Sequence, residues 1–266
     1  MTEVQSPVGD PLELVPQTSA AEQAVADLLS FDISGPDAQA ALDAVPIWFH
    51  TFALAPGVYT PGFARDHRYR IPALGPERIA GRRVLDVGTF DGFYAFLAES
   101  RGASRVVGVD NEQYVDWIQG RFGIDLAPAA GFDTIHALLK SQVAYEKMDA
   151  LEVGTLGEKF DLVLCFGMLH RVPDPVGMLR ALADVLDPGG EIIVETYGSR
   201  RDGSEPVLDV HGPGDVYAGD DFVHWGFPAE GLRRLGAMVG LDAIEVIDEV
   251  EIDGHRRIIA ALRAAG

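Results

Sequence analysis

The residues best suited to holding a ligand are two glycines and two aspartates between positions 86 and 110. Asp86 precedes Gly88 and Gly92 in the spacing Asp-x-Gly-x-x-x-Gly, and Asp110 ends the next apolar run. Glycines let the backbone turn sharply and let a ligand lie against the main chain without meeting a Cβ. A carboxylate roughly 20 positions past such a turn can accept hydrogen bonds from a ribose diol. The pattern therefore predicts a nucleoside site facing the N–H groups of a helix that begins near Gly92.

The same turn argues against a dinucleotide. The G-x-G-x-x-G fingerprint needs a glycine in the middle, so that the backbone can approach a pyrophosphate. Phe90 occupies that position, and its bulky side chain stands where a diphosphate would pass. A NAD-dependent oxidoreductase is therefore disfavoured.

Histidines supply the candidate general bases, because imidazole titrates near neutral pH. His170 follows an apolar run and should stand at the carboxyl end of a central strand, although a buried structural histidine is the alternative. A base within hydrogen-bond reach of a hydroxyl raises the rate of a reaction at that hydroxyl by about 10²–10⁴-fold. His50, His224 and His211 are the further candidates. His211, Asp215 and their neighbours through His224 also invite a metal site, but their spacing fits no ligand motif, so an acidic solvated loop is expected and no metal is predicted.

An open parallel sheet would position these residues. Short apolar runs alternate with helical spacing, which predicts an α/β, Rossmann-like fold. Two late runs joined through Asp253-Gly254 predict an antiparallel C-terminal hairpin. The strands are expected at 83–87, 105–109, 143–146, 160–166, 191–196, 243–251 and 257–262, with 111–126 as a polar excursion and 187–190 as a tight turn.

The flanking regions divide the rest of the chain. Residues 1–18 read as a mobile tail, 19–75 as an N-terminal helical and lid segment, and 76–266 as the ligand-binding domain. Residues 47–62, the lid segment, hold three aromatic residues around His50 and a Pro-Gly-rich turn; they either cover the site or simply pack on the domain. Residues 198–226 are too long for an ordinary connection and are expected as an insertion on the substrate side.

Composition limits the partners. The 266 residues are 47% hydrophobic and carry 21 basic against 41 acidic residues, for a formal net charge of -20. Nucleic-acid binding depends on cationic neutralisation of phosphates, so nucleic acid is disfavoured. No run is long enough to span a membrane, the N-terminus is unlike a signal peptide, and Cys165 has no disulfide partner, so a cytoplasmic location is expected.

From about residue 47 to 262 the chain resembles the class I S-adenosylmethionine (SAM) methyltransferases. More narrowly, it resembles the branch that includes the bacterial tRNA wobble-uridine carboxymethyltransferases and many small-molecule, natural-product methyltransferases. The narrower likeness is carried by Trp48-Phe49-His50, Gly57 to Gly62, Phe160-Asp161 through Gly167-Met168-Leu169, Asp174-Pro175, Glu195-Thr196 and Gly214-Asp215-x-Tyr217-Ala218.

The resemblance implies SAM as cofactor, with S-adenosylhomocysteine (SAH) as product. Asp149 would meet the adenine amine, unless it is a surface acid. The implied cofactor contacts are Asp86, Gly88, Thr89, Gly92, Asp110, Asn111, Asp149, Ala150 and Met168.

The chain departs from the tRNA-modifying members at two points. They have tyrosine then histidine where this chain has His170-Arg171, and they hold a carboxylated SAM with an upstream cation that has no evident counterpart here. We therefore expect ordinary SAM and methyl transfer to a small molecule, at a hydroxyl oxygen of a sugar or natural product. A tRNA-modifying enzyme and a non-catalytic SAM-binding partner protein are the alternatives. A small-molecule substrate, no nucleic acid and no membrane are the expected partners, with a homodimer left open.

Overall fold

The computed structural model describes residues 28–62, 68–201, 205–215, 222–252 and 254–264. The tail expected over 1–18 lies outside these ranges, as does the start of the segment expected over 19–75. In the part of the chain that the structure describes, no helix is long and apolar enough to cross a membrane.

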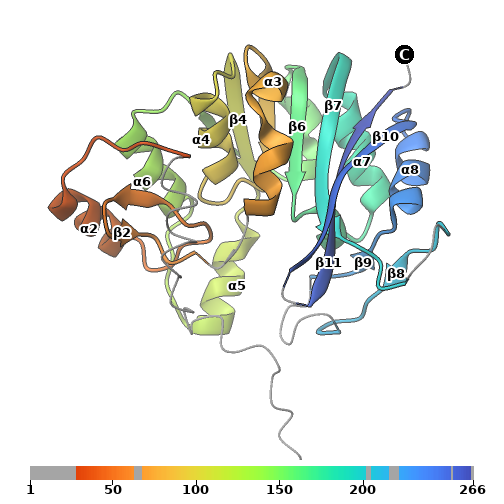
Figure 1. Cartoon of the computed structure of the whole chain (residues 1–266). Helices are drawn as coiled ribbons and strands as arrows, with labels where there is room; N and C mark the ends of the chain where they lie inside the picture. The colour runs from red at the N-terminus through yellow and green to blue at the C-terminus, as the bar shows by residue number, and fades with distance from the viewer. Residues whose placement is uncertain (1–27, 63–67, 202–204, 216–221, 253, 265–266) are drawn as a thin grey trace, which may run out of the picture.

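A seven-stranded sheet organises the described residues (Figure 1). In spatial order its strands are β10 (Ala243–Ile252), β11 (His255–Arg263), β7 (Leu186–Tyr197), β6 (Phe160–Phe166), β3 (Arg83–Val87), β4 (Arg105–Asp110) and β5 (Ala144–Lys147). The pairs from β7 through β5 are parallel, whereas β11 runs antiparallel to both β7 and β10. The expected Rossmann-like methyltransferase sheet with a terminal hairpin is confirmed.

Apolar clusters bury both faces of the sheet. Because successive side chains of a strand point to opposite faces, Val84 and Leu162 enter one cluster and Leu85 and Val163 enter the other. The helices α4 (Phe93–Ser100) and α6 (Ala130–Leu139) pack on the first face. The second face is covered by α7 (Pro175–Asp184) and α8 (Ala229–Ala237).

Two elements differ from the sequence expectation. Residues 113–122, expected as an irregular excursion, form helix α5 (Gln113–Phe122), which ends at Gly123 in the left-handed conformation. Its Tyr114, Trp117, Ile118 and Phe122 recur at helical spacing and pack on the core, although only Ile118 is fully buried, so the sequence carries a helical pattern that the polar residues between them obscured. The tight turn expected at 187–190 lies within β7, as an irregularity in its pairing with β6.

The N-terminal part of the described chain forms short helices and a small hairpin. Helix α2 (Gly35–Ala44) begins at Ser34, whose hydroxyl accepts the Asp37 N–H as expected of an N-cap. The lid segment forms a small hairpin of β1 (Ala53–Ala55) and β2 (Val58–Tyr59), and the helices η1 (Arg68–Leu74) and α3 (Pro76–Ile79) lead into the sheet. The remaining short elements are η2 (Ala150–Leu156), η3 (Leu169–Arg171), β8 (Asp209–Val210) and β9 (Trp225–Gly226).

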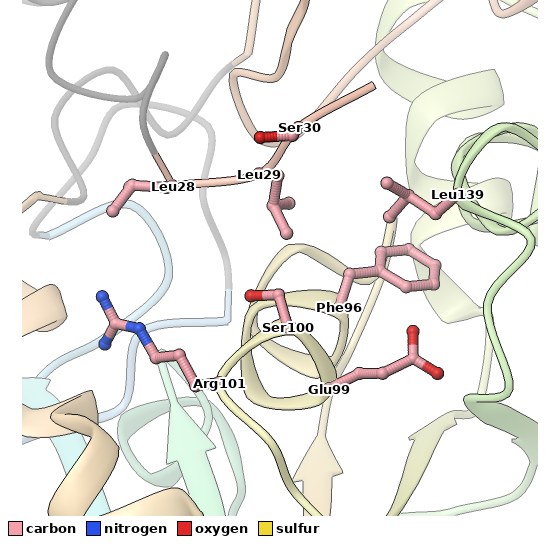
Figure 2. A pocket seen from close by; sticks show the side chains of 8 residues that line it. All are labelled: Leu28, Leu29, Ser30, Phe96, Glu99, Ser100, Arg101 and Leu139. Atoms are coloured by element: carbon pink, nitrogen blue, oxygen red, sulfur yellow. The ribbon is translucent and has the colours of Figure 1, made fainter. Parts of the chain in front are cut away.

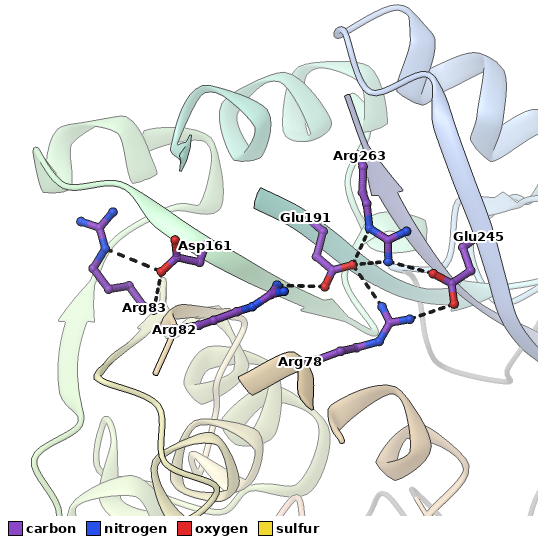
Figure 3. A network of polar contacts seen from close by, with 7 residues as sticks. All are labelled: Arg78, Arg82, Arg83, Asp161, Glu191, Glu245 and Arg263. Atoms are coloured by element: carbon purple, nitrogen blue, oxygen red, sulfur yellow. Dashed lines mark hydrogen bonds and ion pairs between the residues drawn. The ribbon is translucent and has the colours of Figure 1, made fainter. Parts of the chain in front are cut away.

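A charged network ties this N-terminal part to the end of the chain (Figure 3). Glu191 of β7 is buried and pairs with Arg78, Arg82 and Arg263. Glu245 of β10 also pairs with Arg78 and Arg263. The network joins α3, the start of β3 and the terminal hairpin at the amino end of the parallel strands, which leaves the carboxyl end to hold ligands.

Candidate active site

The glycine turn after β3 has the backbone that its sequence predicts. Gly88 and Gly92 have φ values of +74° and +83°, in the left-handed region that favours glycine. A Cβ on Gly88 would lie 2.5 Å from the Met168 sulfur, so the Met168 side chain rests directly against this turn. Any side chain at position 88 would therefore clash with Met168.

Asp110 is fixed to this turn. One of its carboxylate oxygens accepts the Phe90 N–H at 3.0 Å and the other accepts the Glu112 N–H at 2.9 Å. Burial raises the pKa of Asp110, and the two backbone N–H groups oppose that rise. A carboxylate can accept about four hydrogen bonds, so Asp110 keeps capacity for a ribose diol.

Asp86 and Thr89 lie beneath the turn. The Thr89 hydroxyl donates to Asp86 at 2.7 Å, and both side chains are buried. Burial raises the pKa of Asp86 to about 6, although the bond from Thr89 opposes the rise. These two residues shape the turn, and their direct contact with the cofactor stays a prediction.

Asn111 and Asp149 come together across the ends of β4 and β5. The Asn111 amide donates to Asp149 at 3.2 Å, and the other Asp149 oxygen accepts the Leu151 N–H at 2.9 Å. Asp149 is thus the N-cap of η2, which begins at Ala150. The expected adenine-side residues are brought together, and their role stays a prediction.

His170 lies at the carboxyl side of β6, in η3, with 1% of its surface exposed. Its Nδ1 is 3.1 Å from the Thr196 hydroxyl, and its Nε2 has no hydrogen-bond partner among the described residues. Burial lowers the pKa of His170 well below its usual value, and the nearby Arg171 and Arg257 lower it further. The ring is therefore neutral at neutral pH.

A buried ion cluster beside His170 was missed by the sequence reasoning. Glu195 of β7 is fully buried between Arg70, at 2.8 Å, and Arg257, at 2.6 Å. Burial would raise the pKa of Glu195, but the two arginines outweigh it and bring that pKa to about 2. Arg257 lies 4.0 Å from the Tyr197 ring, which in turn contacts His170 edge-on. With two cations and one anion, the cluster has one positive charge in excess.

Arg70 follows the basic residues Arg65 and Arg68 in the sequence, where a solvated side chain is the ordinary expectation. Arg70 is instead buried and bound to Glu195. A basic residue within an otherwise polar run carries no signal of burial, and its partner is 125 positions away.

Of the three further histidines, His211 donates its backbone N–H to the His224 carbonyl at 2.8 Å, and the other two lie in different settings. His50 is buried, and its Nδ1 contacts the Asp91 carboxylate. His224 lies next to η3, because its backbone N–H donates to the backbone carbonyl of His170 at 2.8 Å. Catalysis by either stays a prediction. No group of three or more histidine, cysteine or acidic side chains within the described ranges is placed to hold a metal ion.

A cavity in the described residues lies away from this edge of the sheet (Figure 2). It has a volume of about 510 Å³ and lies between the start of the described chain and the outer ends of α4 and α6. Its lining residues are Leu28, Leu29, Ser30, Phe96, Glu99, Ser100, Arg101 and Leu139. None of them belongs to the carboxyl edge of the sheet, so this cavity is not the candidate cofactor site.

These features define a class of protein. One sheet combines a glycine turn, Asp110 at the end of the strand that follows this turn, and a terminal antiparallel hairpin. The family described as "Methyltransferase domain" matches residues 63–246. The chain belongs to that family and is a class I SAM-dependent methyltransferase.

Its relatives point to a narrower group. The chain is 26% identical over 175 residues to a tRNA U34 carboxymethyltransferase of Sulfurovum sp., covering 66% of this chain and 52% of that protein. It is 31% identical over 167 residues to the protein of the same name from Sulfurimonas denitrificans, covering 63% and 51%. The chain thus spans about half the length of these curated relatives.

Solved structures confirm the fold. The N-terminal domain of EvdMO1, crystallised with SAH, has a TM-score of 0.58 at 21% identity, covering 86% of this chain and 96% of that one. A 1,6-didemethyltoxoflavin-N1-methyltransferase of Burkholderia thailandensis has a TM-score of 0.51 at 18% identity, covering 73% and 76%.

Proposed function

We propose that this methyltransferase transfers the methyl group of SAM to a hydroxyl oxygen of a small molecule, such as a sugar or natural product. The single observation that carries the proposal is the buried, neutral His170, whose Nε2 has no partner among the described residues. A buried polar atom without a partner is costly, which favours a ligand group as its partner in the working enzyme.

The cofactor would lie along the glycine turn. SAM supplies, when bound, a methyl group on a sulfonium sulfur. Gly88 has no Cβ, which would let such a ligand approach the backbone closely beside the Met168 side chain, and Asp110 would accept from the ribose diol. Asn111 and Asp149 would face the adenine. Together these residues would fix the position of the donor, and positioning alone can supply much of the acceleration.

His170 would remove the acceptor's proton. In the tautomer with hydrogen on Nδ1, that nitrogen donates to the Thr196 hydroxyl and Nε2 is left as a proton acceptor. Thr196 thereby fixes the orientation of the ring. A neutral imidazole is ready to accept a proton without first losing one, and the nearby arginines would oppose the positive charge that the ring then gains.

A second candidate is carboxymethyl transfer to tRNA. It is favoured by the names of the relatives and by Arg70 and Arg257, two cations in the ion cluster beside His170, where the acceptor would bind. Glu195 neutralises one of the two positive charges. The formal net charge of -20 opposes binding to RNA phosphates, and the relatives are about twice as long as their matched segments. We therefore rank this function second.

The test is an assay of SAH release from SAM with a panel of hydroxylated small molecules and, in parallel, with tRNA and a carboxylated donor. We expect turnover of at least one small molecule and no retention of tRNA at moderate salt. Turnover restricted to tRNA with the carboxylated donor would establish the second candidate instead. SAM binding by calorimetry without any turnover would support a non-catalytic SAM-binding protein.

A further inference from the structure

We propose that Asp91 is a positioning residue that couples the cofactor site to the lid segment, so that each favours the bound arrangement of the other. The inference rests on the proposed function, because it takes the glycine turn as the place where SAM binds. It assigns His50 to the same coupling and not to proton transfer.

Asp91 lies in the turn but binds the lid segment. Its side chain is 1% exposed. One carboxylate oxygen accepts the N–H groups of both Phe49 and His50, each at 2.8 Å, and the other contacts His50 Nδ1. Charge-assisted hydrogen bonds of this kind are about twice as strong as neutral ones. A single side chain of the turn therefore holds two successive residues that lie more than 40 positions earlier in the chain.

The residue before Asp91 faces the ligand side. The Phe90 N–H donates to Asp110 at 3.0 Å, and Phe90 has a φ of +50°. A left-handed conformation at a bulky residue persists only when its surroundings hold it. The Phe90 ring stacks on Phe49 of the lid segment at 4.8 Å and on Tyr114 of α5 at 3.9 Å. A ligand that engages Asp110 would therefore bear directly on Phe90 and, one residue further, on Asp91.

The lid segment responds as a unit because its own contacts are local and tight. The Thr60 hydroxyl donates to the His50 carbonyl at 2.8 Å and accepts the Phe52 N–H at 2.7 Å. The His50 ring also meets Tyr94 edge-on at 5.1 Å, and the Tyr94 hydroxyl accepts from Arg70 at 3.0 Å. The contacts thus continue from the glycine turn through the lid segment to the ion cluster of Arg70, Glu195 and Arg257.

The coupling predicts a change that can be seen without knowing the acceptor. Saturating SAH should slow amide hydrogen exchange in the wild-type chain at residues 48–62 as well as at the turn and at Asp110. In Asp91→Asn, SAH should still bind, about fivefold or more weakly, and should protect the turn but not residues 48–62. Asp133→Asn, at an exposed acid of α6, is the matched control and should behave as wild type.

Two results would overturn the coupling: no SAH-dependent protection of residues 48–62 in the wild-type chain, or equal protection of them in Asp91→Asn. If Asp91→Asn does not fold, His50→Gln replaces it, because that change leaves both backbone bonds to Asp91 and removes only the ring contact. A partial loss of protection at 48–62 is then expected, and an unchanged pattern would count against the proposal. Failure of SAH to bind the wild-type chain would instead overturn the proposed function.

Discussion

His170 is buried, its pKa lies well below the usual value, and its Nε2 has no hydrogen-bond partner among the described residues. His170→Gln keeps a polar side chain of similar reach but removes the base. We expect kcat to fall about 10²–10⁴-fold while SAM affinity stays near wild type. SAH formation and calorimetry with SAM check the two halves separately. Full activity would exclude His170 as the base, and a parallel loss of SAM binding would indicate a structural role.

His170→Gln should also differ from wild type in how its free energy of unfolding depends on pH. Because the folded-state pKa of His170 is well below the ordinary value of 6.5, the unfolded chain binds a proton below about pH 6.5 that the native chain does not bind. The unfolded state then holds more protons, so the free energy of unfolding falls as the pH is lowered through this range. His170→Gln should lose less stability than wild type between pH 7 and 5, as measured by urea unfolding. Equal losses of unfolding free energy in the variant and the wild type would contradict the lowered pKa of His170.

Asp110 is the residue on which the ribose assignment depends. In Asp110→Asn one oxygen and the charge are lost, and hydrogen bonds to charged groups contribute about 1.5–3 kcal/mol. SAM affinity should therefore fall about 10- to 100-fold. Asp116→Asn, at an exposed acid on α5, should leave the affinity unchanged. Calorimetry on both variants decides the matter, and equal affinities would refute the ribose contact.

At the scale of elements, the lid segment depends on one close approach. A Cβ at Gly62 would lie 2.7 Å from the Thr51 nitrogen and 2.8 Å from the His50 oxygen, and neither backbone atom can move alone. Gly62→Ala should lower the free energy of unfolding by about 1–3 kcal/mol. Gly154→Ala is the control, because a Cβ there has nothing within 4 Å. Equal urea midpoints for the two variants would show that the lid segment packs loosely.

Elements with a strong local signal were predictable from the sequence. The strand at 160–166 was expected with its observed bounds, because an unbroken apolar run between polar residues has few other uses in an α/β fold. Helix α5 was missed because many polar residues separate its apolar side chains, of which only Ile118 is fully buried. The positions of Asp110, Asp149 and His170 at the carboxyl edge were predictable because each lies at or shortly after the end of a recognisable strand.

Contacts between distant elements were not predictable. Asp91 binding Phe49 and His50, and Glu195 joining Arg70 to Arg257, depend on which loops the fold brings together. In the sequence Asp91 is an acid inside a glycine turn, Arg70 lies in a polar run, and Arg257 and Glu195 lie at the ends of two expected strands, so the pattern does not indicate which of them pair. The sheet topology alone makes them neighbours.

At the scale of the whole molecule, charge is placed unevenly. Although acidic residues greatly outnumber basic ones, three arginines converge on Glu191 and join the first and last parts of the fold. Removing one partner of a buried ion network leaves the others uncompensated. Glu191→Gln should therefore lower the free energy of unfolding by about 2–3 kcal/mol.

Glu230→Gln is the contrasting variant. Glu230 pairs with Arg233 and Arg234 on the surface of α8, where solvent screens the interaction, so no measurable loss is expected. Urea unfolding of both variants tests the difference. Similar midpoints would show that the Glu191 network contributes little beyond an ordinary surface pair.

The single cysteine has a practical consequence. Cys165 is fully buried in β6, and burial raises the pKa of its thiol to about 12, so it should be inert to maleimides while the chain is folded. A cysteine introduced on the exposed side of the β1–β2 hairpin would then be the sole target for a fluorescent dye. The surroundings of the hairpin with and without SAH could then be compared by fluorescence, with no native thiol to remove first.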